Sequence, residues 1–149
     1  MKTESLGSLR EGAFLIAQIF QLSGRIFARK MREAHLERLT PEQGRILFVL
    51  WREDGIPIQE LAKRAMLSKS TLTAMLDRLE NSGHVARVPS REDRRRILIY
   101  LTENDLKLRN VYLKLSREMA DLAYRGFSEK EIDAFESNLK KILKNLADC

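Results

Sequence analysis

Residues 60–103, ELAKRAMLSKSTLTAMLDRLENSGHVARVPSREDRRRILIYLTE, form the stretch that decides the fold. Its first half carries two short runs in which apolar residues recur at spacings of three and four, the pattern of amphipathic helices. We expect helices over 59–66 and 69–81, with a break at Leu67 and Ser68, where the serine is a good capping residue. Two short helices joined by so tight a turn are typical of a helix-turn-helix.

The second half of this stretch contains two strand-like runs with a charged turn between them. The runs at 84–88 and 97–101 predict a β-hairpin over 84–101. The turn carries four arginines: Arg91, Arg94, Arg95 and Arg96. Core strands avoid such neighbours, whereas the tip of a hairpin that meets something negative would use them. A helix-turn-helix followed by a hairpin describes a winged helix-turn-helix.

Helices flank this centre on both sides. Residues 8–38 read as one long helix. Thr40 and Gln43 have the spacing of a capping box that starts the next helix, and Ser128 and Glu131 have the same spacing near the C-terminus. A further helix, capped by residues 102–105, is expected to run through Phe127.

The pattern divides the chain into a centre and a helical layer. We expect a winged helix-turn-helix DNA-binding domain over 40–102 and a helical dimerisation region over 8–38 and 104–147. The terminal helices have more apolar surface than so small a centre can cover, and a partner chain is the simplest place to bury the surplus. The predicted fold is mainly α with a small β-hairpin wing.

Composition narrows the class of protein. Apolar residues make up 44% of the chain, the formal net charge is +6 and the pI is about 9.7, which is compatible with a polyanionic partner. The uncharged stretch at 12–24 is shorter than the roughly 20 residues that span a membrane. It is not flanked by the basic region and small-residue cleavage site of a secretory signal. Cys149 is the single cysteine, which fits a reducing compartment. We therefore expect a cytoplasmic protein without a membrane partner.

The sequence contains few residues of the kinds that form catalytic or metal sites. His35 and His84 are the only histidines and lie far apart in sequence, and no Gly-rich phosphate loop or nucleophile motif is present. The sequence thus predicts no catalytic site, no metal site and no cofactor.

The helix expected over 69–81 has a polar face opposite its apolar stripe. That face carries Ser70, Thr73, Ala74 and Asp77, with Lys69, Thr71 and Arg78 beside it. Short hydroxyls can reach base edges and phosphates in the major groove, and a helix N-terminus favours a phosphate. We expect Ser68 chiefly to cap the helix and Ser70 and Thr73 to contact DNA.

Three segments together resemble the MarR/SlyA family of winged-helix transcriptional regulators. They are LTPEQGRILFVL at 39–50, ELAKRAMLSKSTLTAMLDRLENSGHVAR at 60–87 and REDRRRILIYLTE at 91–103. The resemblance is close over 40–103, whereas the flanking helices match in length and order only. It implies a homodimer whose recognition helices enter the major groove of double-stranded DNA and whose wings reach the minor groove.

The resemblance also implies roles for the wing. Asp93 and Arg95 match a pair in which the acid orients an arginine for the minor groove, with Arg94 beside them, and a narrow minor groove attracts arginine. Ala74 stands where the family often has a long polar residue, so a thymine-methyl contact is expected there. The candidate DNA-binding residues are Ser68, Lys69, Ser70, Thr71, Thr73, Ala74, Arg78, Arg91, Asp93, Arg94 and Arg95.

The resemblance further implies a small aromatic or anionic effector in a crevice between the dimer layer and the DNA-binding lobe. Arg45 and Trp51 are the candidate ligand-binding residues, since a cation and an aromatic surface suit such a ligand. The predicted function is a sequence-specific regulator of transcription that binds a two-fold symmetric operator, as a repressor relieved by that ligand. The alternative is a winged-helix protein-interaction module without DNA specificity, which would not need arginines clustered at the hairpin tip.

Overall fold

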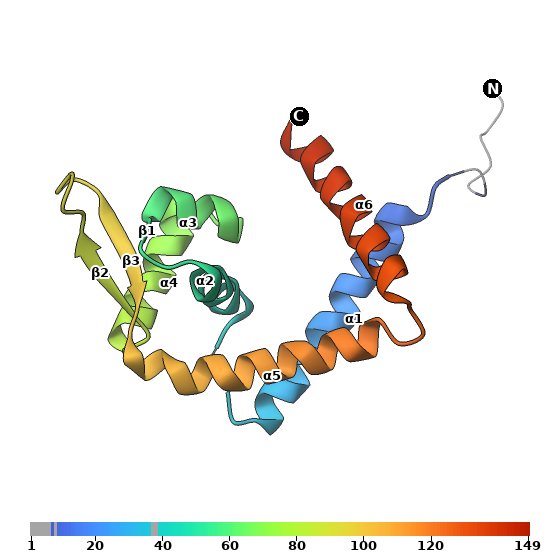
Figure 1. Cartoon of the computed structure of the whole chain (residues 1–149), viewed down its shortest axis with the longest axis horizontal. Coiled ribbons are helices and arrows are strands. Elements are labelled where there is room, and N and C mark those ends of the chain that lie inside the picture. Colours follow the sequence, from blue (N-terminus) through green and yellow to red (C-terminus); the bar gives the residue numbers. More distant parts are fainter. Residues whose placement is uncertain (1–6, 8, 37–38) are drawn as a thin grey trace. The chain divides into compact units, whose positions relative to one another are not determined.

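The computed structural model describes residue 7 and residues 9–36 and 39–149 of the chain (Figure 1). The elements in order are α1 (Gly12–Glu33), α2 (Pro41–Arg52), β1 (Ile56–Pro57), α3 (Ile58–Ala65), α4 (Lys69–Asn81), β2 (Val85–Pro89), β3 (Ile97–Leu101), a 3-10 turn (Glu103–Asp105), α5 (Leu106–Ala123) and α6 (Glu129–Ala147). The predicted fold class, mainly α with a small hairpin, is confirmed. The chain separates into two compact units, residues 1–115 and 116–149.

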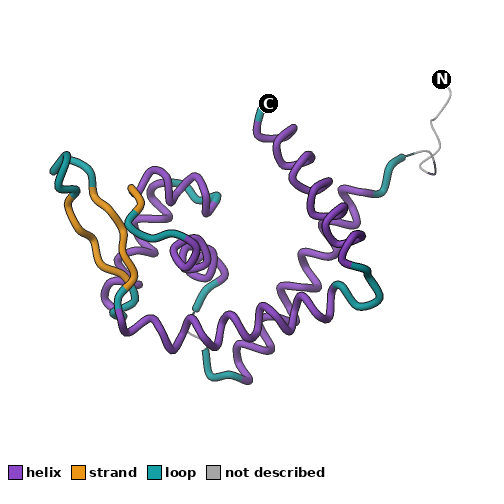
Figure 2. Tube along the Cα trace, in the orientation of Figure 1, coloured by secondary structure: helices purple, strands orange, loops and turns teal. Residues whose placement is uncertain are grey.

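The sheet of the first unit has three antiparallel strands in the order β1-β3-β2 (Figure 2). β2 and β3 pair along their whole length and form the predicted hairpin. The loop that joins the two strands forms the tip of the hairpin and is drawn in teal (Figure 2). β1 adds two residues to the other side of β3, with Ile56 opposite Ile99. Pro57 in β1 and Pro89 in β2 both lie on edge strands, where the missing N–H of proline is tolerated.

The core of this unit joins α2, α3 and α4 to the base of the hairpin. Its buried residues are Ile46, Leu47, Leu50, Ile56, Leu61, Ala65, Leu72, Leu76, Leu79, Val85, Ile99 and Leu108. The apolar spacing of three and four places the helical members on inward faces, and the alternation of a strand places Val85 and Ile99 inward. This arrangement is a winged helix-turn-helix.

The predicted starts of α2, α4 and α6 are confirmed, and each is capped by a side chain that bonds within its own first turn. The Thr40 hydroxyl accepts a hydrogen bond from the Gln43 N–H at 3.2 Å, and the Gln43 side chain accepts one from the Thr40 N–H at 3.0 Å. Ser128 and Glu131 form the same reciprocal pair before α6. The bounds of α4 agree with the expected 69–81.

Two long helices are shorter than predicted. α1 ends at Glu33 because His35 takes a left-handed conformation, with φ of 59°, and the Leu36 N–H bonds back to the Met31 carbonyl. Of the helix expected over 8–38, residues 8, 37 and 38 lie outside the described residues. α5 begins only after the 3-10 turn, because the Thr102 hydroxyl donates to the Gly83 carbonyl and does not cap the helix.

The second unit contains the end of α5, a turn and α6. α5 ends at Ala123, before the predicted Phe127, and Gly126 makes the turn with φ of 86°. The Tyr124 hydroxyl donates to Glu136 Oε1 at 2.8 Å across this turn. α6 buries none of its residues within the described chain, and its apolar positions, predicted to face inward, are half-buried or exposed: Ile132, Phe135, Leu139, Ile142, Leu143 and Leu146.

Candidate nucleic-acid interface

α4 presents one apolar and one polar face. Leu72, Leu76 and Leu79 are fully buried against the core, so the opposite side of the helix is left to solvent. The predicted contact residues of this helix are all exposed, except for half-buried Thr71: Ser68, Lys69, Ser70, Thr73, Ala74 and Arg78. The structure thus brings the predicted polar face of the helix to the surface.

The hydroxyl groups at the start of α4 have different hydrogen-bond partners. Ser68 Oγ accepts from the Thr71 N–H at 3.2 Å and donates to Thr71 Oγ1 at 2.8 Å, so both side chains serve the helix cap. Thr73 Oγ1 donates to the Lys69 carbonyl at 2.8 Å, which leaves its lone pairs free to accept. Ser70 Oγ lies 3.3 Å from Ser68 Oγ. Ser70 and Thr73 therefore remain the hydroxyls of α4 best suited to an outside partner.

The turn before α4 is held in a special backbone conformation. Met66 follows α3 with φ of 56°, and the Leu67 N–H bonds back to the Ala62 carbonyl. This closure ends α3 abruptly and lets Ser68 start α4 two residues later.

The wing tip is closed by hydrogen bonds within residues 90–96. The Ser90 N–H donates to the Arg96 carbonyl at 2.8 Å, and the Arg96 N–H donates to the Asp93 carbonyl at 3.0 Å. Asp93 Oδ1 accepts from the backbone N–H of Arg95 at 3.0 Å. In the described part of the chain, Asp93 thus contacts the main chain of Arg95, and their side chains form no ion pair.

A small basic hollow joins the wing to the start of α4. It has a volume of about 220 Å³ and is lined by Pro57, Ile58, Gln59, Lys69, Arg95, Arg96 and Ile97. Three of these described residues are cationic and none is acidic. The predicted DNA-binding set contains Lys69 and Arg95. Arg96 was named only as an arginine of the turn, and Gln59 was not predicted, because only the fold brings the start of α3 next to the wing.

Arg87 is a second residue absent from the predicted set. Its guanidinium lies 2.7 Å from Asp77 Oδ1 and 3.5 Å from Glu80 Oε2, both on α4. It also donates to the Thr73 carbonyl at 3.3 Å. A basic residue two positions after a buried strand residue is the only signal for it in the sequence.

The two predicted ligand-binding residues lie apart. Arg45 is exposed on α2, whereas half-buried Trp51 packs its ring 4.8 Å from that of Tyr112. Trp51 Nε1 donates to Asp105 Oδ2 at 2.5 Å. Neither Arg45 nor Trp51 lines any of the four best-formed cavities of the described residues.

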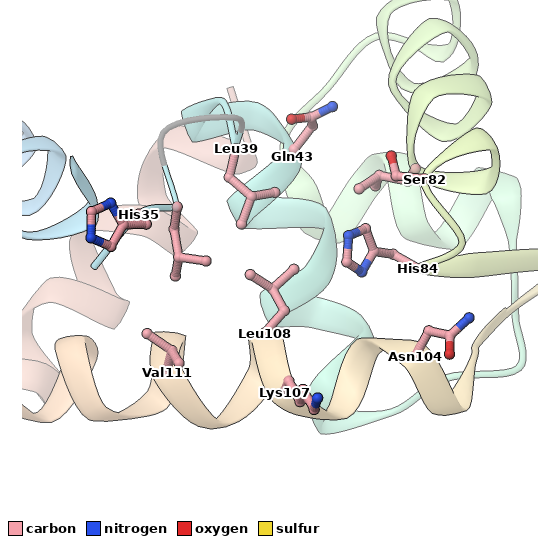
Figure 3. A pocket seen from close by; sticks show the side chains of 11 residues that line it. His35, Leu39, Gln43, Ser82, His84, Asn104, Lys107, Leu108 and Val111 are labelled. Atoms are coloured by element: carbon pink, nitrogen blue, oxygen red, sulfur yellow. The ribbon is translucent and has the colours of Figure 1, made fainter. Parts of the chain in front are cut away.

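Two larger cavities flank the start of α2. The first has a volume of about 520 Å³ (Figure 3), with an apolar wall from Leu36, Leu39, Leu79, Leu108 and Val111 and polar groups from His35, Gln43, Ser82, His84, Asn104 and Lys107. The second, about 310 Å³, is lined by residues of α1, the start of α2 and Tyr112 of α5. Burial raises the pKa of the Tyr112 hydroxyl above its ordinary value.

The residues that the structure describes give no indication of a metal site or a membrane span. These residues contain no group of three His, Cys, Asp or Glu side chains that could hold a metal ion. No helix among them is long and apolar enough to cross a membrane.

Known proteins are similar to this chain in sequence and in fold. The model of the MarR family matches residues 39–97. The transcriptional activatory protein BadR of Rhodopseudomonas palustris is 31% identical over 140 residues, which cover 89% of this chain and 78% of BadR. The chain belongs to the MarR family.

Two further relatives are similar to parts or most of this chain. The regulator TtmR of Methylorubrum extorquens is 46% identical over 79 residues, which cover 52% of this chain. The chain spans only 40% of the length of TtmR. A crystal structure of the S. aureus MepR-DNA complex matches with a TM-score of 0.76 at 26% identity, over 90% of this chain and 95% of that one. The MarR-family resemblance read from the sequence is confirmed.

Proposed function

We propose that this chain is a sequence-specific regulator of transcription that binds double-stranded DNA. The observation that carries the proposal is the basic hollow in which Lys69 of α4 meets Arg95 and Arg96 of the wing. Three cations around a hollow that has no acidic residue in its lining suit a phosphate, and the start of a helix adds unpaired N–H groups. Membership of the MarR family, with MepR solved on DNA, supports the same reading.

Each DNA-reading element has its own part in this proposal. α4 enters the major groove, where Ser70 and Thr73 contact bases and Arg78 contacts the backbone. The wing carries Arg95 to the minor groove, with Arg91 and Arg94 near the phosphates. Both elements belong to the domain proposed over 40–102.

The proposed regulator is a homodimer held by 8–38 and 104–147. Large apolar side chains of α1 are exposed in the single chain, among them Phe14 at 65% and Phe20 at 79%. In α6, Leu143 is 58% and Leu146 68% exposed. Apolar surface on this scale indicates a protein partner, and two copies around a two-fold axis would fit a two-fold symmetric operator.

We also propose repression that is relieved by a small aromatic or anionic ligand. The two cavities beside α2 offer an apolar wall with a few polar groups, as small-molecule sites do. BadR is named an activator, so the direction of regulation is open to direct test. Transcription from a template carrying the selected operator should fall when the protein is added and recover with an aromatic carboxylate.

Selection of bound DNA from a random-sequence pool, at two stated salt concentrations, tests the function. We expect an enriched palindrome. The double variant Lys69→Ala, Arg96→Ala should lower the salt slope of binding by about two, one for each lost phosphate contact. Lys130→Ala, Lys140→Ala removes the same charge from exposed positions of α6 and should leave the slope unchanged. A folded protein that enriches no sequence would instead support the protein-interaction module.

A further inference from the structure

Arg87 ties the wing to the helix that is proposed to read DNA. It lies in β2, and its guanidinium contacts the Asp77 and Glu80 carboxylates and the Thr73 carbonyl, all three on α4. We propose that Arg87 is a positioning residue that sets the wing and α4 in the geometry needed to engage both grooves together. This inference rests on the proposed DNA-binding function and adds a role for a residue that need not touch DNA.

The position of Arg87 along β2 explains why it can act as a tie. Side chains two residues apart in a strand share a face, so Arg87 lies on the face of Val85, which is buried in the core. The strand then leaves the core: Val88 and Pro89 are exposed, and the exposed loop follows. Arg87 is thus the last side chain of β2 that the described structure ties to α4 before the wing projects outward.

The three partners of Arg87 lie along one side of α4. Thr73, Asp77 and Glu80 are separated by four and three residues, which stacks them on one face of a helix. Three contacts spread over two turns define an orientation, which a single contact would not. A planar guanidinium with five donors suits such a set of acceptors, and an ammonium would not replace it.

The charge of Asp77 makes the contact relevant to DNA. Asp77 lies on the same exposed face as Ser70 and Thr73, where an unpaired carboxylate would repel phosphates. At 2.7 Å, Arg87 neutralises it. The carboxylate is therefore best explained as an anchor for Arg87.

Folding stability is a poor explanation for this ion pair. The side chain of Asp77 is 59% exposed and that of Glu80 is 43% exposed. Ion pairs that are so accessible to water contribute little to the free energy of unfolding, because solvent screens them. These ion pairs can still fix the position of the wing relative to α4, and that effect can be measured through DNA binding.

The test compares Asp77→Asn, Arg87→Gln and the double variant for binding to the selected operator at two salt concentrations. Positioning predicts that Asp77→Asn weakens binding by about tenfold, although it removes a negative charge from the DNA-facing surface. Arg87→Gln should weaken binding similarly with an unchanged salt slope, since no phosphate contact is lost. The double variant should bind no more weakly than the weaker single variant, because both substitutions remove the same interaction.

The controls separate the alternatives. Glu92→Gln removes a wing carboxylate that has no ion pair in the described structure, so it should leave binding equal or tighter. Urea unfolding of each variant should give the midpoint of the parent protein. If Asp77→Asn binds more tightly and Arg87→Gln lowers the salt slope by about one, Arg87 is a phosphate contact and the positioning role is wrong. A parent protein that selects no operator would refute the proposed function itself, before any variant is compared.

Discussion

The indole Nε1 of Trp51 donates a hydrogen bond of 2.5 Å to Oδ2 of Asp105. This contact joins the last turn of α2 to the 3-10 turn that precedes α5. Asp105 is only 2% exposed, and its other oxygen lies 3.3 Å from Nδ1 of His84, at the start of the wing. A buried carboxylate therefore connects three segments that are far apart in the sequence.

Loss of the indole donor should destabilise the fold. Trp51→Phe keeps an aromatic ring beside Tyr112 but leaves a buried acceptor of Asp105 without its partner, which costs about 1–3 kcal/mol of unfolding free energy. Equilibrium urea unfolding measures the loss. In an Asp105→Asn background the same substitution should cost less, because the charge is gone. Equal costs in the two backgrounds would show that the hydrogen bond is not the source of the effect.

Gly55 should be intolerant of a side chain. Its φ is 69°, and a Cβ there would lie 2.8 Å from the ring of Tyr100. Gly55→Ala should lower the free energy of unfolding by at least about 1–2 kcal/mol, the cost of a left-handed residue with a Cβ. Gly12→Ala is the matched control, because a Cβ at Gly12 meets nothing within 4 Å. An effect of equal size at both positions would contradict this explanation.

Assembly gives a third prediction. Sedimentation at micromolar concentration should give about twice the chain mass of 17.3 kDa. Phe20→Asp places a charge on the most exposed apolar side chain of α1 and should shift the protein toward monomer. Phe48→Asp changes an exposed residue of α2, outside the proposed dimer region, and should leave the mass unchanged. A parent protein that is monomeric over this range would exclude the dimer.

The wing gives a fourth prediction, sharpened by the contact of Asp93 with the Arg95 N–H. Asp93→Ala removes the acceptor that shapes the turn and should weaken operator binding, although the wing becomes more positive. Asp93→Asn keeps an acceptor oxygen and should bind at least as tightly as the parent. Arg95→Ala should weaken binding and flatten the preference for A·T-rich flanks. Tighter binding by Asp93→Ala would mean that the arginines act only as a diffuse positive patch.

Local signals in the sequence were sufficient for the helix-turn-helix and the wing. The capping box at Thr40 depends on residues three positions apart, and the bounds of α4 follow from Ser68 before it and Gly83 after it. The end of α1 was not predictable in this way, because His35 rather than a glycine takes the left-handed conformation.

The candidate site was predicted unevenly for the same reason. Lys69, Ser70 and Arg95 carry a recognisable pattern along the chain, so they could be named from it. Arg87 could not, because its partners lie on another element and are found only once β2 packs beside α4. The sequence indicated Asp105 only as part of the capping segment 102–105, and its burial is explained by the tertiary contact with Trp51.

The two edge prolines of the sheet have a consequence for solubility. An open sheet edge offers unpaired N–H and C=O groups to the strands of other molecules, which is a route to aggregation. Pro57 lies on one edge strand and Pro89 on the other, and neither can donate a backbone hydrogen bond to an added strand. Copies of this chain are therefore hindered from joining edge to edge through their wings, which favours association through the exposed faces of their helices.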